Sequence, residues 1–197
     1  PGFYIDKYFS NHYAWQNDFN TSKTLKIRGG IRIPTKRFEL SGETRLINDL
    51  IFWSQTALPD QLTGVLQVIS INLNQHFKLW GFNSNNQVMW QATSDDVAMP
   101  LPLFSGYSSN YYENTVFKVL RFQIGFDVKY HTSYYTPTYM PATMQFYNQR
   151  VREIGNYPFV DAFINFQLKR ARIGIMTEHI NYGNFSNDYF ITTNYPN

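Results

Sequence analysis

Histidine and serine are the side chains in this sequence best suited to catalysis near neutral pH. The histidines are far apart and lack the HxxxH spacing of a zinc site; they are His12, His76, His131 and His179. His131-Thr132-Ser133 would put a histidine and a serine on one side of an extended segment, as in a hydrolase that attacks lipid. Both share the parity of Asp127 and Lys129, whose charges favour water, whereas attack on lipid requires the opposite side. We therefore interpret these residues as a polar strand end.

Acidic and aromatic residues give two further candidate sites. Asp95 and Asp96 are adjacent, so in an extended chain their carboxylates point apart and do not form an acid/base pair. A loop folded by its own prolines and leucines is the favoured interpretation, and a calcium-bound loop is the alternative. Six tyrosines could form a sugar-binding rim, although a girdle at a membrane surface is favoured; they are Tyr107, Tyr111, Tyr112, Tyr134, Tyr135 and Tyr139. We predict no catalytic residue, no metal site and no cofactor.

Composition narrows the classes of protein that the chain can belong to. Of 197 residues, 18% are aromatic and 16% charged, against about 25% charged in a typical soluble domain. So many aromatic residues exclude a disordered chain. The 17 basic and 14 acidic residues give a net charge of +3 without a run of like charge, which argues against nucleic acid as a partner. The absence of Cys excludes zinc fingers, disulfide scaffolds and thiol chemistry. No apolar run reaches the ~18 residues of a membrane helix, whereas a membrane β-barrel remains possible.

Alternation of apolar and polar residues is the dominant pattern. From Leu120 to Tyr130 every even residue is apolar or aromatic, and the odd residues are Arg, Gln, Gly, Asp and Lys. A period of two indicates a β-strand, because a helix would scatter both sets around its axis. The pattern predicts eight strands, at about 19–33, 37–52, 64–77, 82–93, 107–117, 119–132, 156–168 and 171–181. The segments 82–93 and 107–117 alternate less clearly and are more polar.

These strands have two chemically different sides. The polar sides are predicted to line a lumen: Lys26, Arg28, Arg32, Arg37, Glu39, Glu43, Arg45, Arg121, Asp127, Lys129, Asp161, Arg172 and Glu178. The apolar sides are predicted to face lipid: Leu25, Ile27, Ile31, Leu40, Ile71, Leu73, Phe122, Ile124, Phe126, Val128, Val160, Ile164, Ile173 and Ile175. Charges of both signs are interspersed on the polar sides, so we expect weak ion selectivity at most. The alternative is that these side chains pair and fill the interior without forming a channel.

The lengths of strands and connections favour a membrane barrel. The predicted strands exceed the ~5–6 residues usual in soluble proteins and suit the ~9–11 needed to cross a bilayer. Short connections at 34–36, 78–81, 117–118 and 169–170 alternate with long ones, as in outer-membrane barrels with short periplasmic turns. We expect an all-β fold, an antiparallel transmembrane up-and-down β-barrel. Residues 1–18 would form an extracellular loop segment, 19–181 the barrel strands, and 182–197 an outer loop before a missing terminal strand.

Several ordered motifs carry a resemblance to a known family. They are SNHYAWQNDF at 10–19, DDVAMPLPL at 95–103, YMPATMQFYNQ at 139–149 and IGNYPFVD at 154–161, followed by LKRAR at 168–172 and Glu178-His179. In this order they resemble the Bacteroidetes putative porin family, in its C-terminal portion. The resemblance implies an outer-membrane, porin-like barrel with a further aromatic-ended strand, and it implies no catalytic or ligand residues. We therefore expect this chain to be part of a longer one, in the outer membrane of a Gram-negative bacterium.

Three functions follow from these expectations. The leading one is a pore for passive diffusion of small solutes, with membrane lipid and lipopolysaccharide as surroundings. The second is an accessory or structural barrel subunit of a larger complex with other outer-membrane proteins, because long aromatic loops at 94–106 and 133–155 resemble interfaces. The third is a soluble β-sandwich that binds carbohydrate, which would bury the apolar sides between two sheets.

Overall fold

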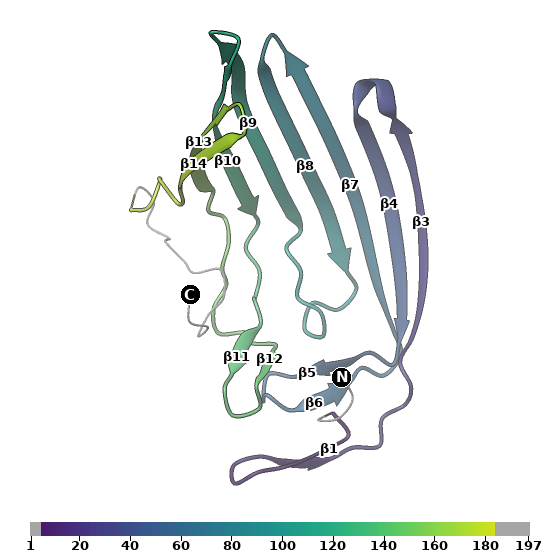
Figure 1. The fold of residues 1–197 in the computed structure, drawn as a ribbon. Helices are drawn as coiled ribbons and strands as arrows, with labels where there is room; N and C mark the ends of the chain where they lie inside the picture. Colours follow the sequence, from purple (N-terminus) through teal and green to yellow (C-terminus); the bar gives the residue numbers. More distant parts are fainter. Residues whose placement is uncertain (1–4, 184–197) are drawn as a thin grey trace.

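The computed structural model describes residues 5–183. Its main element is one curved antiparallel sheet of eight strands in a single layer (Figure 1). The strands are β3 (Lys23–Ile33), β4 (Phe38–Asn48), β7 (Val65–Leu79), β8 (Phe82–Thr93), β9 (Phe104–Val116), β10 (Leu120–His131), β13 (Phe159–Leu168) and β14 (Ala171–Thr177). Each pairs with the strand that precedes it in this series, so the sheet is an up-and-down meander. The predicted all-β class and the eight predicted strands are confirmed.

Several strand bounds differ from the predicted ones by a few residues, and two of the differences have a clear cause or consequence. The predicted strand 37–52 ends at Asn48, because Asp49 has a positive φ of 54° and its N–H donates to the carbonyl of Gly64. The predicted strand 64–77 continues to Leu79, so Lys78 belongs to the sheet and not to the turn. The turn itself is Trp80-Gly81, with φ of 48° and 88°, which matches the twist of a tight hairpin. A strand extended by two residues brings another charged side chain onto the sheet.

Three short hairpins occupy the end of the sheet where the long connections lie (Figure 1). They pair β1 (Lys7–Phe9) with β2 (Ala14–Gln16), β5 (Ile51–Trp53) with β6 (Pro59–Gln61), and β11 (Thr138–Met140) with β12 (Gln145–Tyr147). The predicted loop segment 1–18 therefore contains a hairpin. At the opposite end the turns are short, and one of them is the 3-10 turn η1 (Pro34–Lys36). The predicted sorting of short and long connections is confirmed, while most of the predicted loop 182–197 lies outside the described residues.

Strand register sorts the side chains onto two faces. One row crosses the sheet through Ile31, Leu40, Leu73, Val88, Gly106 and Tyr130. The neighbouring row runs through Arg32, Glu39, Asn74, Gln87, Tyr107, Lys129 and Phe159 on the opposite face. The alternation seen in each strand is thus in phase across the sheet, which gives one apolar face and one polar face.

The buried apolar residues lie away from the apolar face. Ile47 and Leu66 are buried on the polar face, and the others are in the connections: Ala57, Ala98, Ile154 and Tyr157. In the described part of the chain β3 and β14 are edges, each with one neighbour. No helix within residues 5–183 is long and apolar enough to cross a membrane.

Candidate functional site

The polar face of the sheet gathers most of the residues predicted to line a lumen. Register places Lys26, Arg28 and Arg32 of β3 opposite Arg45, Glu43 and Glu39 of β4. The same face continues onto β10, β13 and β14, where it carries Arg121, Asp127, Lys129, Asp161 and Arg172. Arg37 lies in the turn before β4 and Glu178 one residue beyond β14.

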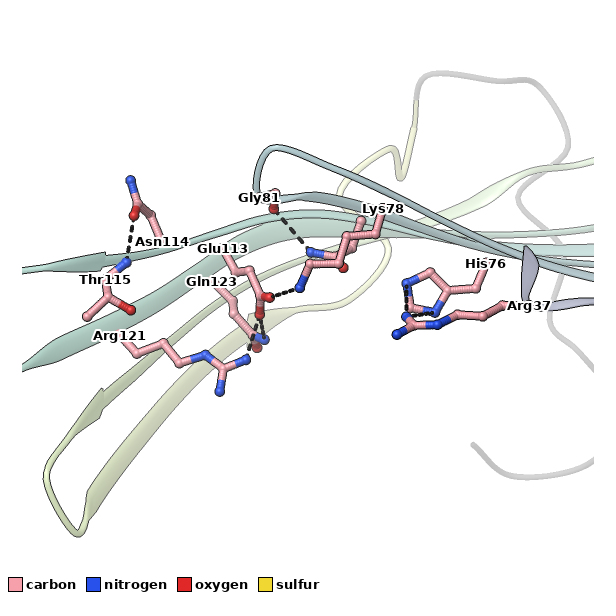
Figure 2. Close-up of polar contacts among 10 residues, drawn as sticks. Arg37, His76, Lys78, Gly81, Glu113, Asn114, Thr115, Arg121 and Gln123 are labelled. Carbon is pink, nitrogen blue, oxygen red and sulfur yellow. Dashed lines mark hydrogen bonds and ion pairs between the residues drawn. The ribbon is translucent and has the colours of Figure 1, made fainter. Parts of the chain in front are cut away.

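Glu113 of β9 joins three strands at the end with short turns (Figure 2). Its Oε1 lies 2.7 Å from Lys78 Nζ, and its Oε2 lies 2.7 Å from Arg121 Nη2. Gln123 Nε2 also donates to Oε2, at 3.1 Å. The backbone N–H of Glu113 donates to the Gly81 carbonyl, which fixes the turn against β9. Glu113 therefore holds β7, its turn and β10 together.

Two more carboxylates have the same arrangement. Glu43 Oε2 is 3.0 Å from Lys26 Nζ, and its Oε1 accepts from Arg45. Asp161 Oδ2 is 2.9 Å from Lys129 Nζ, and its Oδ1 accepts the backbone N–H of His179. In each group the carboxylate lies close to the sheet and pairs with a basic side chain of a neighbouring strand, Lys26 of β3 or Lys129 of β10. The second partner is Arg45 on the same strand for Glu43, and a backbone N–H for Asp161.

Exposure differs between the two signs of charge. The carboxylate side chains of Asp161, Glu43 and Glu113 are only 5–14% exposed, whereas their basic partners are 48–58% exposed. The pattern continues on β3, where the Arg32 side chain is 77% exposed and pairs loosely with Glu39 at 3.8 Å. Although the sequence shows mixed charge, the exposed charge of these groups is therefore mainly positive.

His76 and Asp127 on this face have surroundings that the sequence did not indicate. Arg37 Nη1 lies 3.1 Å from His76 Nδ1 and 3.3 Å from His76 Nε2, across the short-turn end (Figure 2). Asp127 lies directly opposite Asp161 in register, and its buried Oδ1 has no hydrogen-bond partner among the described residues. His76 is thus a neighbour of a basic side chain, which disfavours a metal ion at that position.

The connection between β8 and β9 folds over the polar face. Met99 and Leu101 of this connection line a cavity with residues of β4, β7 and β8. The strand residues lining it are Glu43, Arg45, Ile47, Val68, Ser70, Asn72, Met89 and Gln91. Apolar Met99 and Leu101 lie beside Ile47, Val68 and Met89, three apolar residues of the mostly polar face. The connection therefore covers part of the polar face of β4, β7 and β8 and narrows the space beside it.

A second long connection holds this loop in place. Asn148 Nδ2 donates to the carbonyls of Val97 and Ala98, at 2.7 and 2.9 Å. Arg150 Nη2 lies 2.8 Å from Asp96 Oδ1, and its guanidinium stacks 4.8 Å from the centre of the Tyr135 ring. The hydrogen bond from Arg150 lowers the pKa of the Asp96 carboxyl below its usual range, and the same bond raises the pKa of Arg150. Asp96 therefore stays ionised at neutral pH and ties the two loops together.

Asp95 has a structural role in the same loop. Its Oδ1 accepts the backbone N–H groups of Val97, at 2.9 Å, and Ala98, at 3.0 Å. The loop is thus held by its own Asp95, whereas the sequence favoured its prolines and leucines, and calcium stays an untested alternative. Residues 5–183 bring no three His, Asp or Glu side chains together in a way that could hold a metal ion.

The other sequence candidates are dispersed. His131 Nδ1 lies 3.1 Å from the Thr132 carbonyl and its ring contacts Tyr134, while Asn156 Oδ1 accepts the Ser133 N–H. No described hydrogen bond joins His131 to the Ser133 hydroxyl. Tyr111 contacts Phe163 on the polar face, whereas Tyr112 contacts Phe122 on the apolar face, so the six tyrosines do not share one surface.

Sequence analysis missed the functional residues that depend on tertiary contacts. Lys78 was placed in a turn, and Glu113 lies in the weakly alternating segment 107–117. The available signal was that Glu113 and Tyr111 are two residues apart, so both lie on the same side of the strand. Nothing in the sequence indicated that Asn148 and Arg150 would contact a loop about fifty residues earlier.

The apolar face carries all the residues predicted to face lipid, and many are strongly exposed. Ile31 is 65% exposed, Ile173 63% and Ile124 51%. No second sheet or helix covers this face in the described part of the chain. Uncovered apolar surface of this extent is unusual for a soluble monomer and marks contact with lipid or protein.

Comparison with known proteins gives one match. The family model described as "Putative porin" matches residues 1–197. Neither the curated proteins nor the solved structures gave a match to the chain.

Proposed function

Because the chain belongs to the putative porin family, we propose that it is a porin-like outer-membrane β-barrel through which small solutes diffuse passively. The observation that carries the proposal is the two-faced sheet, with exposed Ile and Leu on one face and charged side chains on the other. Water fills the space beside the charges, and hydrocarbon contacts the apolar face. The proposal assigns no catalytic residue.

A barrel also accounts for the edges of the sheet. β3 and β14 each leave one side unpaired in the described residues. In hydrocarbon an unpaired strand edge is too costly, so we propose that further strand pairing closes the sheet. Trp80 and Phe117 are 91% and 85% exposed at the tips of short turns, where aromatic rings suit the membrane–water boundary. We place the short turns in the periplasm and the interlocked loops outside, among lipopolysaccharide. Similarity of the motifs to Bacteroidetes members supports an origin in that group.

The exposed basic side chains on the polar face give the pore a preference for anions, within the weak ion selectivity that the sequence predicts. Basic side chains such as Lys129 and Arg121 extend into the space beside the sheet, whereas Asp161 and Glu113 lie beneath them. A solute in the lumen therefore meets positive charge first, and we propose a modest preference for small anions.

Planar-bilayer recording of the full-length protein tests this function. We expect stepwise conductance and, across a KCl gradient, a reversal potential whose sign shows that Cl− is more permeant than K+. Arg121→Gln should move the reversal potential toward the cation side, because it removes an exposed positive charge. A silent bilayer with correctly folded protein would remove the channel function, and a cation-selective pore would remove the anion preference.

A specific observation supports the accessory-subunit alternative. Phe9 and Val151 in the layer of long connections are 85% and 95% exposed, and exposed apolar loop residues are typical of protein interfaces. Extraction in a mild detergent, followed by measurement of particle mass, would show a larger complex if this role is correct. The soluble sandwich has less support, because no second sheet packs on the apolar face within residues 5–183.

A further inference from the structure

The apolar face contains a cluster of four hydrogen-bonded polar residues, Ser84 and Asn86 of β8 and Ser108 and Asn110 of β9. We call these four residues the polar island. Register puts Ser84 opposite Asn110 and Asn86 opposite Ser108. Both pairs lie on the same face as Phe77 and Phe126, which are opposite Ser84 on β7 and Asn110 on β10. The island therefore faces away from the charged side chains of the candidate pore.

Most of the side chains around the island on this face are apolar. Along the two strands it is followed by Phe82 and Tyr112 at one end and by Val88 and Gly106 at the other. Phe126 and Val128 of β10 flank it on one side. On the other side β7 places Phe77 opposite Ser84 and Gln75 opposite Asn86, and the Gln75 amide N–H groups donate to the carbonyls of Lys36 and His76. β8 and β9 each have two or more neighbouring strands on either side, so the open edges of the sheet do not affect this position.

The four side chains form a closed ring of hydrogen bonds. Ser84 Oγ donates to Asn110 Oδ1 at 2.7 Å, and Asn110 Nδ2 donates to Ser108 Oγ at 2.8 Å. Ser108 Oγ then donates to Asn86 Oδ1 at 2.7 Å, and Asn86 Nδ2 donates to Ser84 Oγ at 2.9 Å. The ring fixes all four side chains in one geometry.

The ring leaves hydrogen-bonding capacity unused. Each asparagine amide has two N–H groups, and the ring uses one of each. No described residue accepts the second N–H of Asn86 or of Asn110. Hydrocarbon cannot accept these bonds either, so lipid is a poor neighbour for the island. A protein surface with acceptors at the same depth would satisfy them.

We propose that the polar island is the contact through which two copies of this protein associate side by side in the membrane. Ser and Asn are both donors and acceptors, so the island is complementary to itself and needs no opposite charge. Two copies inserted in the same direction carry their islands at the same depth, and rotation about an axis along the membrane normal brings the islands together. Gly106 and the two serines are small, which lets the two sheets approach closely.

This inference depends on the apolar face lying in the bilayer, which is part of the proposed function. It adds a protein–protein interface to that function.

Residues 1–197 contain no Cys, so single cysteines can be introduced as reporters in a cysteine-free full-length protein. Val88→Cys places a reporter beside the island on β8, and Phe126→Cys is a second reporter beside it on β10, so the four residues of the ring stay in place. Ile31→Cys is the matched control, because Ile31 is on the same face, on β3, three strands away from β8.

Treatment of membranes with a short bis-maleimide should give a product of twice the monomer mass from Val88→Cys and Phe126→Cys, and almost none from Ile31→Cys. Adding Asn110→Leu, which opens the ring, should reduce the yield several-fold while single-channel conductance is retained. Equal cross-linking at all positions, no cross-linking at Val88→Cys and Phe126→Cys, or a product containing a different protein would overturn the proposal. Labelling of Ile31→Cys by a water-soluble maleimide would instead remove the bilayer placement and the proposed function with it.

Discussion

Replacement of Ile71 by arginine tests which solvent contacts the apolar face. Ile71 is 45% exposed near the middle of β7, between Gly42 and Trp90 on the neighbouring strands. The 15 residues of β7, at ~3.3 Å each and tilted by ~45°, span ~35 Å, so Ile71 lies near the bilayer midplane. An arginine there should cost about 2–4 kcal/mol of unfolding free energy in lipid, a factor of roughly 30 to 1,000 in the folding equilibrium. On a surface in water the cost would stay within about 0.5 kcal/mol.

The measurement is urea unfolding of the protein in lipid vesicles, followed by tryptophan fluorescence. Ser70→Arg is the matched control, because Ser70 is the preceding residue on the opposite face and lies opposite Glu43, which can pair with the new charge. We expect Ser70→Arg to change the unfolding free energy by less than about 1 kcal/mol. Equal costs for the two variants would refute the assignment of lipid to one face and water to the other.

Three further changes test other parts of the structure. Glu113→Gln removes a charge shared by two basic side chains, so the reversal potential in a KCl gradient should move further to the anion side; an unchanged potential would place Glu113 outside the conducting path. Gly81→Ala should cost about 1–3 kcal/mol in urea unfolding, because Gly81 has a φ of 88° and a Cβ there would lie 2.6 Å from the Glu113 carbonyl oxygen; Gly29→Ala, with open space around it, is the control and should be nearly neutral. The pKa of Asp96 is lowered by Arg150, so their bond stabilises the loops above pH ~4 and is lost as the pH falls through the lowered pKa. Because the Asp96 side chain is 69% exposed, we expect at most about 1 kcal/mol, seen as faster proteolysis of the loops at acidic pH that Asp96→Asn makes independent of pH.

The strands and their two faces could be predicted from the sequence because alternation is a local property of an extended chain. Leu120 to Tyr130 shows the pattern without interruption, and the structure confirms both the strand and the face of each residue. Strand ends were less predictable, since Asp49 ends β4 through its positive φ and a contact with Gly64. The sequence also showed that charges of both signs share one face, but it could not show which sign is more exposed.

The tertiary structure decided every feature that joins residues far apart in the chain. Asn148 holds the loop at Val97 and Ala98, and this contact depends on how two long connections fold together. The polar island appears in the sequence only as weak alternation in segments 82–93 and 107–117. Register alone shows that these polar residues share a face with Phe77 and Phe126 and close a ring across two strands. A period of two fixes which side of its own strand a residue occupies, whereas strand pairing decides which residues meet on that side.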